Sequence, residues 1–535
     1  MPFLFARTAR VNPRHVITAP APGVVRTVRP LAPQSAPRWH TAAVFAAIAC
    51  NVASVAGLRF FPYGDMPNHL ARYSLISLSW HHTAPGWVQF HWVPTSYIAV
   101  DVIGAALVTV LGPMGASLAL TIAYLTLLPL GMFALLRAVN PRSAAWALVG
   151  SLMAFNWCFL TGFYSYSIGV GLALLWLAWW WPRRAVTTAR VRLVGVFGVA
   201  ALYLVHMSAA AIALAAVGSA CIEPLLVVRH RRHSWRQIAV RCVPMMIYAA
   251  GPLLIYVLVR MQSAGIGHPA NSMTFRDPAD KLRHFLTPFA SFSPAQTFFL
   301  FGAYLLAIWL RYRHDRPVAR HLTWTLTAAV LLFAYTIFPT LFLGAWDVDV
   351  RFLLPAYLLL FVLPATRETR PPRAAVIGVL FALVVVQAAT TLWYGIRIDR
   401  ETADVVRLLP TDASNTLVLP TDEDEFFRID PFTHVGEWAT VRNANSRVNS
   451  LFAGGADGGA HLDHFLVERT LYEPGAHWAR LGFAPLDWDR VRADYQFILL
   501  TGSNPEGIAR ASEGAVVVAT NASGRLLRVV GGAQR

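Results

Sequence analysis

The stretch FPYGDMPNHLARYS, residues 61–74, directly follows the first long hydrophobic segment of the chain. Asp65 precedes a Met-Pro pair, a pattern typical of a helix N-cap with proline in the first turn. A helix over about 65–80 would place Asp65, His69 and Arg72 within about 60° of one another, because each residue turns by about 100°. The stretch therefore predicts a short helix beside a membrane, with three polar side chains on one face.

The composition around this stretch is that of a membrane protein. Of the 535 residues, 56% are hydrophobic and only 14% are charged, whereas average globular domains carry about 25% charged residues. Apolar runs near the length of a bilayer-spanning helix recur from about residue 41 to 394. We predict a polytopic α-helical membrane protein with roughly 11–13 spans. We give the number of spans as a range because residues 96–137 look like two helices around GPMG. That arrangement would leave Arg137 and Arg142 on the outer side, against the usual position of arginines.

The net charge of +17 is unevenly distributed. Residues 1–394 hold 31 basic and 9 acidic side chains, and residues 395–535 hold 14 basic and 19 acidic ones. Arginine-rich loops normally mark the cytoplasmic side of a membrane protein, so this pattern argues against nucleic-acid binding. The clusters predicted to be cytoplasmic lie at 182–192, 229–241, 311–320 and 366–373.

Three regions follow from this topology. Residues 1–38 are predicted to be a disordered basic cytoplasmic tail, and 39–394 a multi-span membrane domain with outer loops at 61–94 and 261–294. Residues 395–535 are predicted to form a small periplasmic α/β domain, with strand-like runs and helical segments. Those strands lie at 415–420, 496–500, 514–520 and 524–530, and the helices at 400–409 and 488–495. Only one of the 45 basic residues is a lysine, a bias typical of a GC-rich bacterial genome, and we expect a bacterial inner-membrane protein.

The acidic residues of the membrane part are placed selectively. Of the nine carboxylates before residue 395, five fall in predicted outer loops: Asp65, Asp277, Asp280, Asp347 and Asp349. Solubility does not need such a placement, so it favours an outward-facing site. The alternative is that Asp65 only caps its helix, while His69 and Arg72 are interfacial polar residues.

An aspartate in the first outer loop, just after the first span, resembles the catalytic aspartate of the GT-C class of integral membrane glycosyltransferases. The stretch DVDVRFLLPAYLLL (347–360), with an arginine and a proline opening a late span, is similar to a feature of bacterial relatives of protein O-mannosyltransferases and aminoarabinose transferases. The resemblance covers roughly residues 40–394. It implies a polyprenyl-phosphate-linked sugar as donor, and a glycan, lipid or protein acceptor on the outer face of the membrane. Many relatives carry two adjacent acids in this loop, but Met66 follows Asp65 here, and we predict no metal and no cofactor.

Sugar transfer from a lipid phosphate needs a base for the acceptor hydroxyl and a cation for the leaving phosphate. We predict Asp65 as the general base and Arg351 as the phosphate ligand, since a guanidinium matches phosphate in bidentate fashion. Direct displacement would invert the anomeric centre. Asp347 and Asp349 could orient Arg351, contact the acceptor, or only solvate the loop.

Five further residues are predicted to contact substrate. His69 and Arg72 could assist Asp65 or bind sugar hydroxyls. His206 lies at the expected outer turn of a hairpin, where it could line the cavity or pack as an ordinary buried histidine. Tyr164 and Tyr166 lie at another expected outer turn and could stack on sugar, or could belong to the aromatic belt of a membrane interface.

Two other function classes fit the same composition. A transporter or flippase of lipid-linked precursors would place ionisable residues near the middle of its spans, and here only Asp101 and Glu223 lie in apolar segments, near their ends. A polymerase or ligase of lipid-linked glycans would use a similar outer site with a large central loop.

Overall fold

The computed structural model describes residues 37–531, with gaps at 91, 185–187, 228–234, 263–272, 315–321, 342–346, 366–370, 422–428, 433, 450–453, 456–464, 468–470, 473–482 and 484. The tail predicted at 1–38 therefore lies almost wholly outside the described residues, as does part of the outer loop predicted at 261–294.

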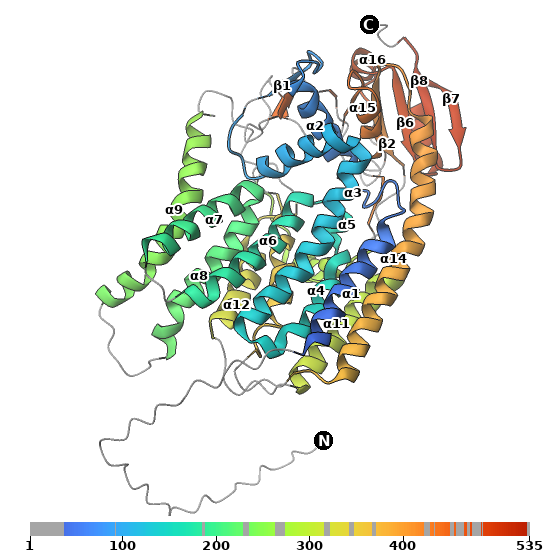
Figure 1. Cartoon of the computed structure of the whole chain (residues 1–535). Helices are drawn as coiled ribbons and strands as arrows, with labels where there is room; N and C mark the ends of the chain where they lie inside the picture. The colour runs from blue at the N-terminus through green and yellow to red at the C-terminus, as the bar shows by residue number, and fades with distance from the viewer. Residues whose placement is uncertain are drawn as a thin grey trace, which may run out of the picture. The chain divides into compact units, whose positions relative to one another are not determined.

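The described part of the chain is mainly helical (Figure 1). The helices preceding the C-terminal sheet are α1 Arg38–Val55, α2 Met66–Trp80, α3 Ile98–Val139, α4 Leu148–Leu152, α5 Trp157–Leu160, α6 Tyr164–Trp180, α7 Ala189–Val205, α8 Met207–Val227, α9 Trp235–Gln262, α10 Pro278–His284, α11 Pro294–His314, α12 Leu322–Ile337, α13 Leu353–Leu359 and α14 Ala374–Leu408. Among the described helices, α3 and α14 are long and apolar enough to cross a membrane, by length and composition.

The long helix α3 is broken near its middle. Gly112 has φ 71° and ψ 171°, which no helical residue adopts, and Pro113 follows it. Glycine tolerates a positive φ because it has no Cβ, and proline cannot donate a backbone hydrogen bond, so the pair ends one helix and starts the next. The two helices predicted around GPMG are thus confirmed.

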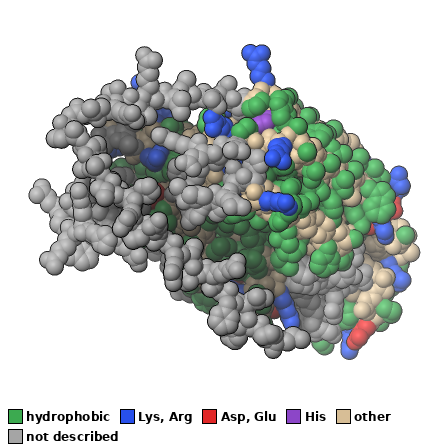
Figure 2. Space-filling view, turned by 90° about the horizontal axis from the view of Figure 1, so that it is seen from below, with side chains coloured by type: hydrophobic (Ala, Val, Ile, Leu, Met, Phe, Trp, Pro, Cys, Tyr) green, Lys and Arg blue, Asp and Glu red, His purple; other side chains and the backbone are tan. Residues whose placement is uncertain are grey.

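Several helices expose large apolar side chains. Val110, Phe197, Met246, Phe333 and Trp393 are each more than 60% exposed. Figure 2 shows hydrophobic side chains over much of the described surface in that view. Water would penalise such a surface, whereas lipid would not.

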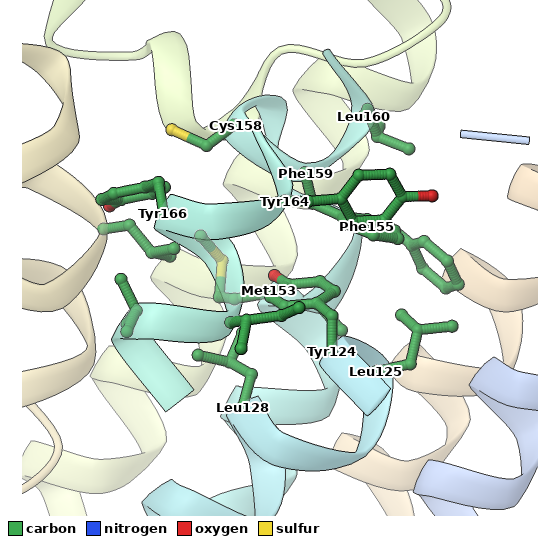
Figure 3. Packing of buried hydrophobic residues seen from close by; sticks show 14 of the residues in the cluster. Tyr124, Leu125, Leu128, Met153, Phe155, Cys158, Phe159, Leu160, Tyr164 and Tyr166 are labelled. Carbon is green, nitrogen blue, oxygen red and sulfur yellow. The ribbon is translucent and has the colours of Figure 1, made fainter. Parts of the chain in front are cut away.

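The core is rich in aromatic rings. Tyr124 of α3 stacks on Phe159 of α5 at a centroid distance of 4.2 Å, and Figure 3 shows both within the buried cluster that joins α3, α5 and α6. Where lipid surrounds the helices, close van der Waals packing of such rings is a main attraction between them. This packing holds the turn between α5 and α6 in place.

A sheet follows α14. Its five strands are β2 Asn415–Pro420, β3 Arg447–Val448, β6 Phe497–Thr501, β7 Ala515–Asn521 and β8 Gly524–Val529, in the order β3-β2-β6-β8-β7. Strands β2 and β6 are parallel, and β6, β8 and β7 pair antiparallel. Helices α15 Trp438–Arg442, α16 Trp488–Asp494 and α17 Pro505–Ser512 accompany the sheet, and a second sheet joins β1 Val88–Phe90, β5 Phe465–Val467 and β4 Gly454–Gly455. The four predicted strands are confirmed, since each run alternates or buries apolar residues between turn residues.

One boundary differs from the prediction. We expected the last span to end at 394 and a separate helix to begin near 400, but α14 runs unbroken from Ala374 to Leu408. Between Gly395 and the end of α14 the chain contains no further glycine and no proline, so the backbone hydrogen bonds of the helix continue without interruption. The expected domain boundary at 394/395 therefore falls inside a helix.

Candidate active site

The helix predicted after residue 65 is present as α2, and Asp65 occupies its N-cap position. The Asp65 side chain makes no capping hydrogen bond, and its backbone has helical angles. Its backbone N–H instead donates to the carbonyl of Thr161, at 2.8 Å. The alternative in which Asp65 serves only as a cap is therefore wrong.

Two glycines allow this close approach of the first outer loop to the turn between α5 and α6. A Cβ on Gly64, which has φ 48°, would lie 2.4 Å from the carbonyl oxygen of Thr161. A Cβ on Gly162, which has φ 92°, would lie 2.8 Å from the Asp65 nitrogen. The position of Asp65 is thus fixed by backbone packing rather than by its side chain.

Asp65 and His69 are the two residues between 61 and 77 that are not buried. They are four residues apart, so they lie on the same side of α2. The His69 ring lies 5.9 Å from the ring of Tyr73 and 6.1 Å from that of Tyr164. Burial lowers the pKa of His69 from 6.5 to about 4, opposed by the carboxylates of Asp101 and Asp65.

Arg72 is buried, unlike Asp65 and His69, although we predicted that these three side chains would share one face of α2. It is 4% exposed, and its guanidinium lies 2.6 Å from the carboxylate of Asp101 on α3. The ring of Tyr97 covers the same guanidinium at 5.3 Å. A cation inside a packed helix pair needs an anion nearby, which Asp101 supplies. We also expected α2 to lie along the membrane surface with its apolar side down, but α2 packs against α3 and α15.

Arg351 is in the short helix η5 Val350–Phe352, next to the same turn that holds Asp65. Its guanidinium carbon lies 4.6 Å from the ring centre of Phe163, and Nη1 lies 3.1 Å from Nε2 of His206. The Tyr166 hydroxyl donates to its carbonyl oxygen at 2.6 Å. Asp65 and Arg351 therefore pack against consecutive residues, Gly162 and Phe163.

His206 lies at the turn between α7 and α8, as predicted. The Ser208 N–H lies 3.1 Å from Nδ1 of His206, an arrangement in which Nδ1 accepts. A neutral imidazole that accepts at Nδ1 carries its proton on Nε2. A guanidinium also only donates, so with this tautomer the 3.1 Å approach of Arg351 Nη1 to Nε2 of His206 is a close contact and not a hydrogen bond.

Tyr164 and Tyr166 lie in the first turn of α6, and Figure 3 shows them pointing to opposite sides. The Tyr164 hydroxyl is hydrogen-bonded with Thr121 at 3.0 Å and lies 3.3 Å from the hydroxyl of Ser117, both on α3. Each tyrosine is at most 1% exposed. Both therefore hold the turn against its neighbours, and a stacking role on sugar stays a prediction.

Asp347 and Asp349 precede Arg351 but pair with other cations. Arg276 contacts both carboxylates, at 2.7 Å in the case of Asp349, and Lys281 lies 3.3 Å from Asp349. Asp349 is fully buried, so the interpretation as loop solvation is wrong for it. Arg276 and Lys281 thereby tie the segment that contains α10 to the start of η5.

Sequence reasoning missed His434, which lies beside Asp65. Its Nε2 is 3.2 Å from Oδ1 of Asp65, and its Nδ1 is 3.4 Å from Nδ2 of Asn68. Asn68 is one turn from Asp65, a spacing that could have drawn attention to it. Nothing in the sequence connects His434 to a helix 366 residues earlier.

Among the described residues, no group of three or more His, Cys, Asp or Glu side chains could hold a metal ion.

No family model matches this chain, and no curated protein matches it by sequence. Two crystal structures of ArnT from Cupriavidus metallidurans resemble it. For the structure bound to undecaprenyl phosphate the TM-score is 0.51 at 10% identity, over 92% of this chain and 98% of that one. For the apo structure the TM-score is 0.50 at 12% identity, over 93% and 99%. The chain therefore has a GT-C-like fold, the fold of the glycosyltransferase ArnT.

Proposed function

We propose that this protein is a membrane glycosyltransferase that moves a sugar from a polyprenyl-phosphate donor to an envelope glycan, lipid or protein. The similarity to ArnT extends over nearly the whole chain, and one of the ArnT structures contains undecaprenyl phosphate. A shared fold does not by itself carry function, so the proposal depends on the chemistry of the site.

The observation that carries it is that Asp65 and Arg351 pack against consecutive residues of one turn. The backbone nitrogen of Asp65 lies against Gly162, and the guanidinium of Arg351 lies against Phe163, although the two residues are far apart in the sequence. An acid–base group beside a phosphate ligand is what transfer from a lipid phosphate requires.

In the proposed reaction, a carboxylate oxygen of Asp65 takes the proton of the acceptor hydroxyl. The acceptor oxygen attacks the anomeric carbon, and the bond from that carbon to the phosphate oxygen breaks, with its electron pair leaving on the phosphate. Arg351, with His206 beside it, stabilises the charge on the departing lipid phosphate. A single displacement inverts the anomeric centre.

The membrane setting follows from composition and surface. The exposed apolar side chains suit lipid contact, and the arginine-rich loops suit a cytoplasmic side. We propose a multi-pass inner-membrane protein whose N-terminus is cytoplasmic and whose C-terminal sheet is periplasmic, with the site facing outward.

The flippase and the polymerase or ligase alternatives predict different chemistry. A flippase would move its lipid-linked substrate without breaking the bond between sugar and phosphate. Release of free polyprenyl phosphate separates it from a transferase.

The test is the variant Asp65→Asn in protein reconstituted into nanodiscs. Undecaprenyl phosphates carrying glucose, mannose or aminoarabinose serve as donors, envelope extract supplies the acceptor, and released undecaprenyl phosphate is measured. We expect kcat to fall by at least about 100-fold, since loss of a general base typically costs 10²–10⁴. The control is Asp489→Asn, at a side chain that is 93% exposed. Full activity of Asp65→Asn, or no release by the wild-type protein, would contradict the proposal.

A further inference from the structure

The region after α14 contacts the first outer loop at several points. Trp438 lies edge-on against Phe60 at 5.1 Å, and the Arg447 guanidinium lies 5.1 Å from the ring of Trp87. Strand β1 of the loop pairs antiparallel with β5, with Val88 opposite Val467. This region therefore forms part of the wall around the candidate active site.

His434 comes from a segment that is held on both sides. The Ile429 N–H donates to the Ser291 carbonyl at 3.1 Å, and the Glu437 N–H donates to the His434 carbonyl at 3.1 Å, opening the short helix η6 Val435–Glu437. His434 itself is 8% exposed. An imidazole on an anchored backbone can hold a partner with little loss of conformational entropy.

The contacts of the imidazole determine which nitrogen carries the proton. The Asn68 amide nitrogen is a donor, and it lies 3.4 Å from Nδ1 of His434. Nδ1 therefore accepts, and in the neutral ring the proton is on Nε2. That N–H is directed at Oδ1 of Asp65, 3.2 Å away.

We propose that His434 is a positioning residue for Asp65: its neutral imidazole donates from Nε2 to Oδ1 and leaves Oδ2 for the acceptor hydroxyl. The inference rests on the proposed function and assigns the C-terminal region a part in it. No bond is made or broken by His434, and the acceptor proton goes to Asp65. Asn68 is fully buried and orients the imidazole in turn.

Protonation of His434 would change this arrangement. A cationic imidazole pairs with the carboxylate and removes it from its role as a base, so transfer falls as the imidazole ionises. Other ionisable groups lie on the elements packed around the pair: His69 and Arg72 on α2, Asp101 on α3, Tyr164 on α6 and Glu437 in η6.

The experiment compares His434→Phe, which keeps a flat ring without a donor, with His434→Gln, whose amide can donate but does not ionise. A hydrogen bond to a charged group contributes about 1.5–3 kcal/mol, so we expect kcat of His434→Phe to fall by about 10- to 100-fold. Binding of undecaprenyl phosphate should stay within about twofold, and His434→Gln should recover most of kcat. The control is His81→Phe, an exposed histidine at the other end of α2.

Two readouts separate positioning from a structural role. The acid limb of the pH profile should move to lower pH by at least about one unit in His434→Gln, because the ionising ring is gone. The double variant Asp65→Asn/His434→Phe should be no slower than Asp65→Asn alone, because the two act through one group.

An unchanged acid limb in His434→Gln, or a kcat of His434→Phe close to that of the wild type, overturns the role of His434. If the His434 variants give such a result while Asp65→Asn is inactive in the same experiments, the role of His434 is refuted but the proposed function stands. If Asp65→Asn is active, the proposed function itself fails.

Discussion

Arg72 and Asp101 join α2 to α3 through an ion pair in which neither side chain is more than 5% exposed. Asp349 also forms buried ion pairs, because its carboxylate contacts Arg276 and Lys281 and is itself shielded from water. Burying a charge is costly unless its partner is in place, so such pairs hold helices in one register. Asp65 and His69 differ from them, because each is only partly buried.

The ion pair leads to a prediction for Arg72. Arg72→Met leaves Asp101 buried without its cation, and we expect the free energy of unfolding to fall by about 3–5 kcal/mol. The double variant Arg72→Met/Asp101→Leu removes both charges and should be close to the wild type. Thermal unfolding in detergent, followed by tryptophan fluorescence, measures both. A wild-type melting temperature for Arg72→Met would show that the pair is not buried as described.

A second prediction concerns acid sensitivity at His69. The folded protein keeps this ring neutral down to about pH 4, whereas the unfolded chain protonates it near pH 6.5. The unfolded state therefore binds one more proton in this window, and the free energy of unfolding falls as the pH is lowered from 6.5 to 4. We expect His69→Gln to lose this dependence, as measured by chemical denaturation at several pH values. An equally steep decline in His69→Gln would contradict the assignment.

The turn between α5 and α6 is the element on which the site is assembled. Thr161 accepts the Asp65 N–H, Gly162 packs under the Asp65 nitrogen, and Phe163 lies against Arg351. The turn is itself held by Tyr166, whose hydroxyl reaches the Arg351 carbonyl. A displacement of this turn should therefore move Asp65 and Arg351 together.

The variant Gly162→Ala tests this element. Its Cβ would lie 2.8 Å from the Asp65 nitrogen, at a backbone φ of 92° that alanine adopts only with strain. We expect a loss of about 1–3 kcal/mol in stability and a fall in kcat of about 100-fold from misplacement of Asp65. Gly57→Ala is the matched control, because nothing lies within 4 Å of a Cβ there. Equal activities of Gly162→Ala and Gly57→Ala would show that the turn does not position Asp65.

Over the whole molecule, the helices expose apolar side chains, and strand β5, which follows α14 in the chain, pairs with β1 of the first outer loop. Helix α14 joins the two parts without a break (Figure 1). One continuous helix restricts how the sheet can lie relative to the membrane end of α14 more than a flexible linker would.

The proposed topology predicts which side each part faces. The background for this test is a variant in which the four cysteines are replaced. In it, we expect Ala522→Cys to react with a membrane-impermeant maleimide in spheroplasts, because residue 522 lies in the exposed turn between β7 and β8. Arg183→Cys, in an exposed stretch after α6, should react only after the membrane is permeabilised. Labelling of both from the same side would contradict the topology.

Local patterns in the sequence were enough to predict the helix after Asp65, the break at Gly112, the turn at His206 and the strand at 415–420. Helix periodicity, proline and glycine effects and strand alternation depend on neighbouring residues only, so a single chain reveals them. The position of Asp65 and His69 on one side of α2 follows from the same spacing.

Partners across the chain could not be predicted in this way. Arg72 could equally have faced the site or Asp101, and Asp349 could have served Arg351 or, as it does, Arg276. His434 had no signal at all. A buried charge pairs with whichever opposite charge the packing of helices brings close, and no local pattern encodes that choice. The sequence by itself determined the elements and the chemistry available to them, and only the tertiary structure decided which side chains meet, because those contacts depend on how distant segments pack.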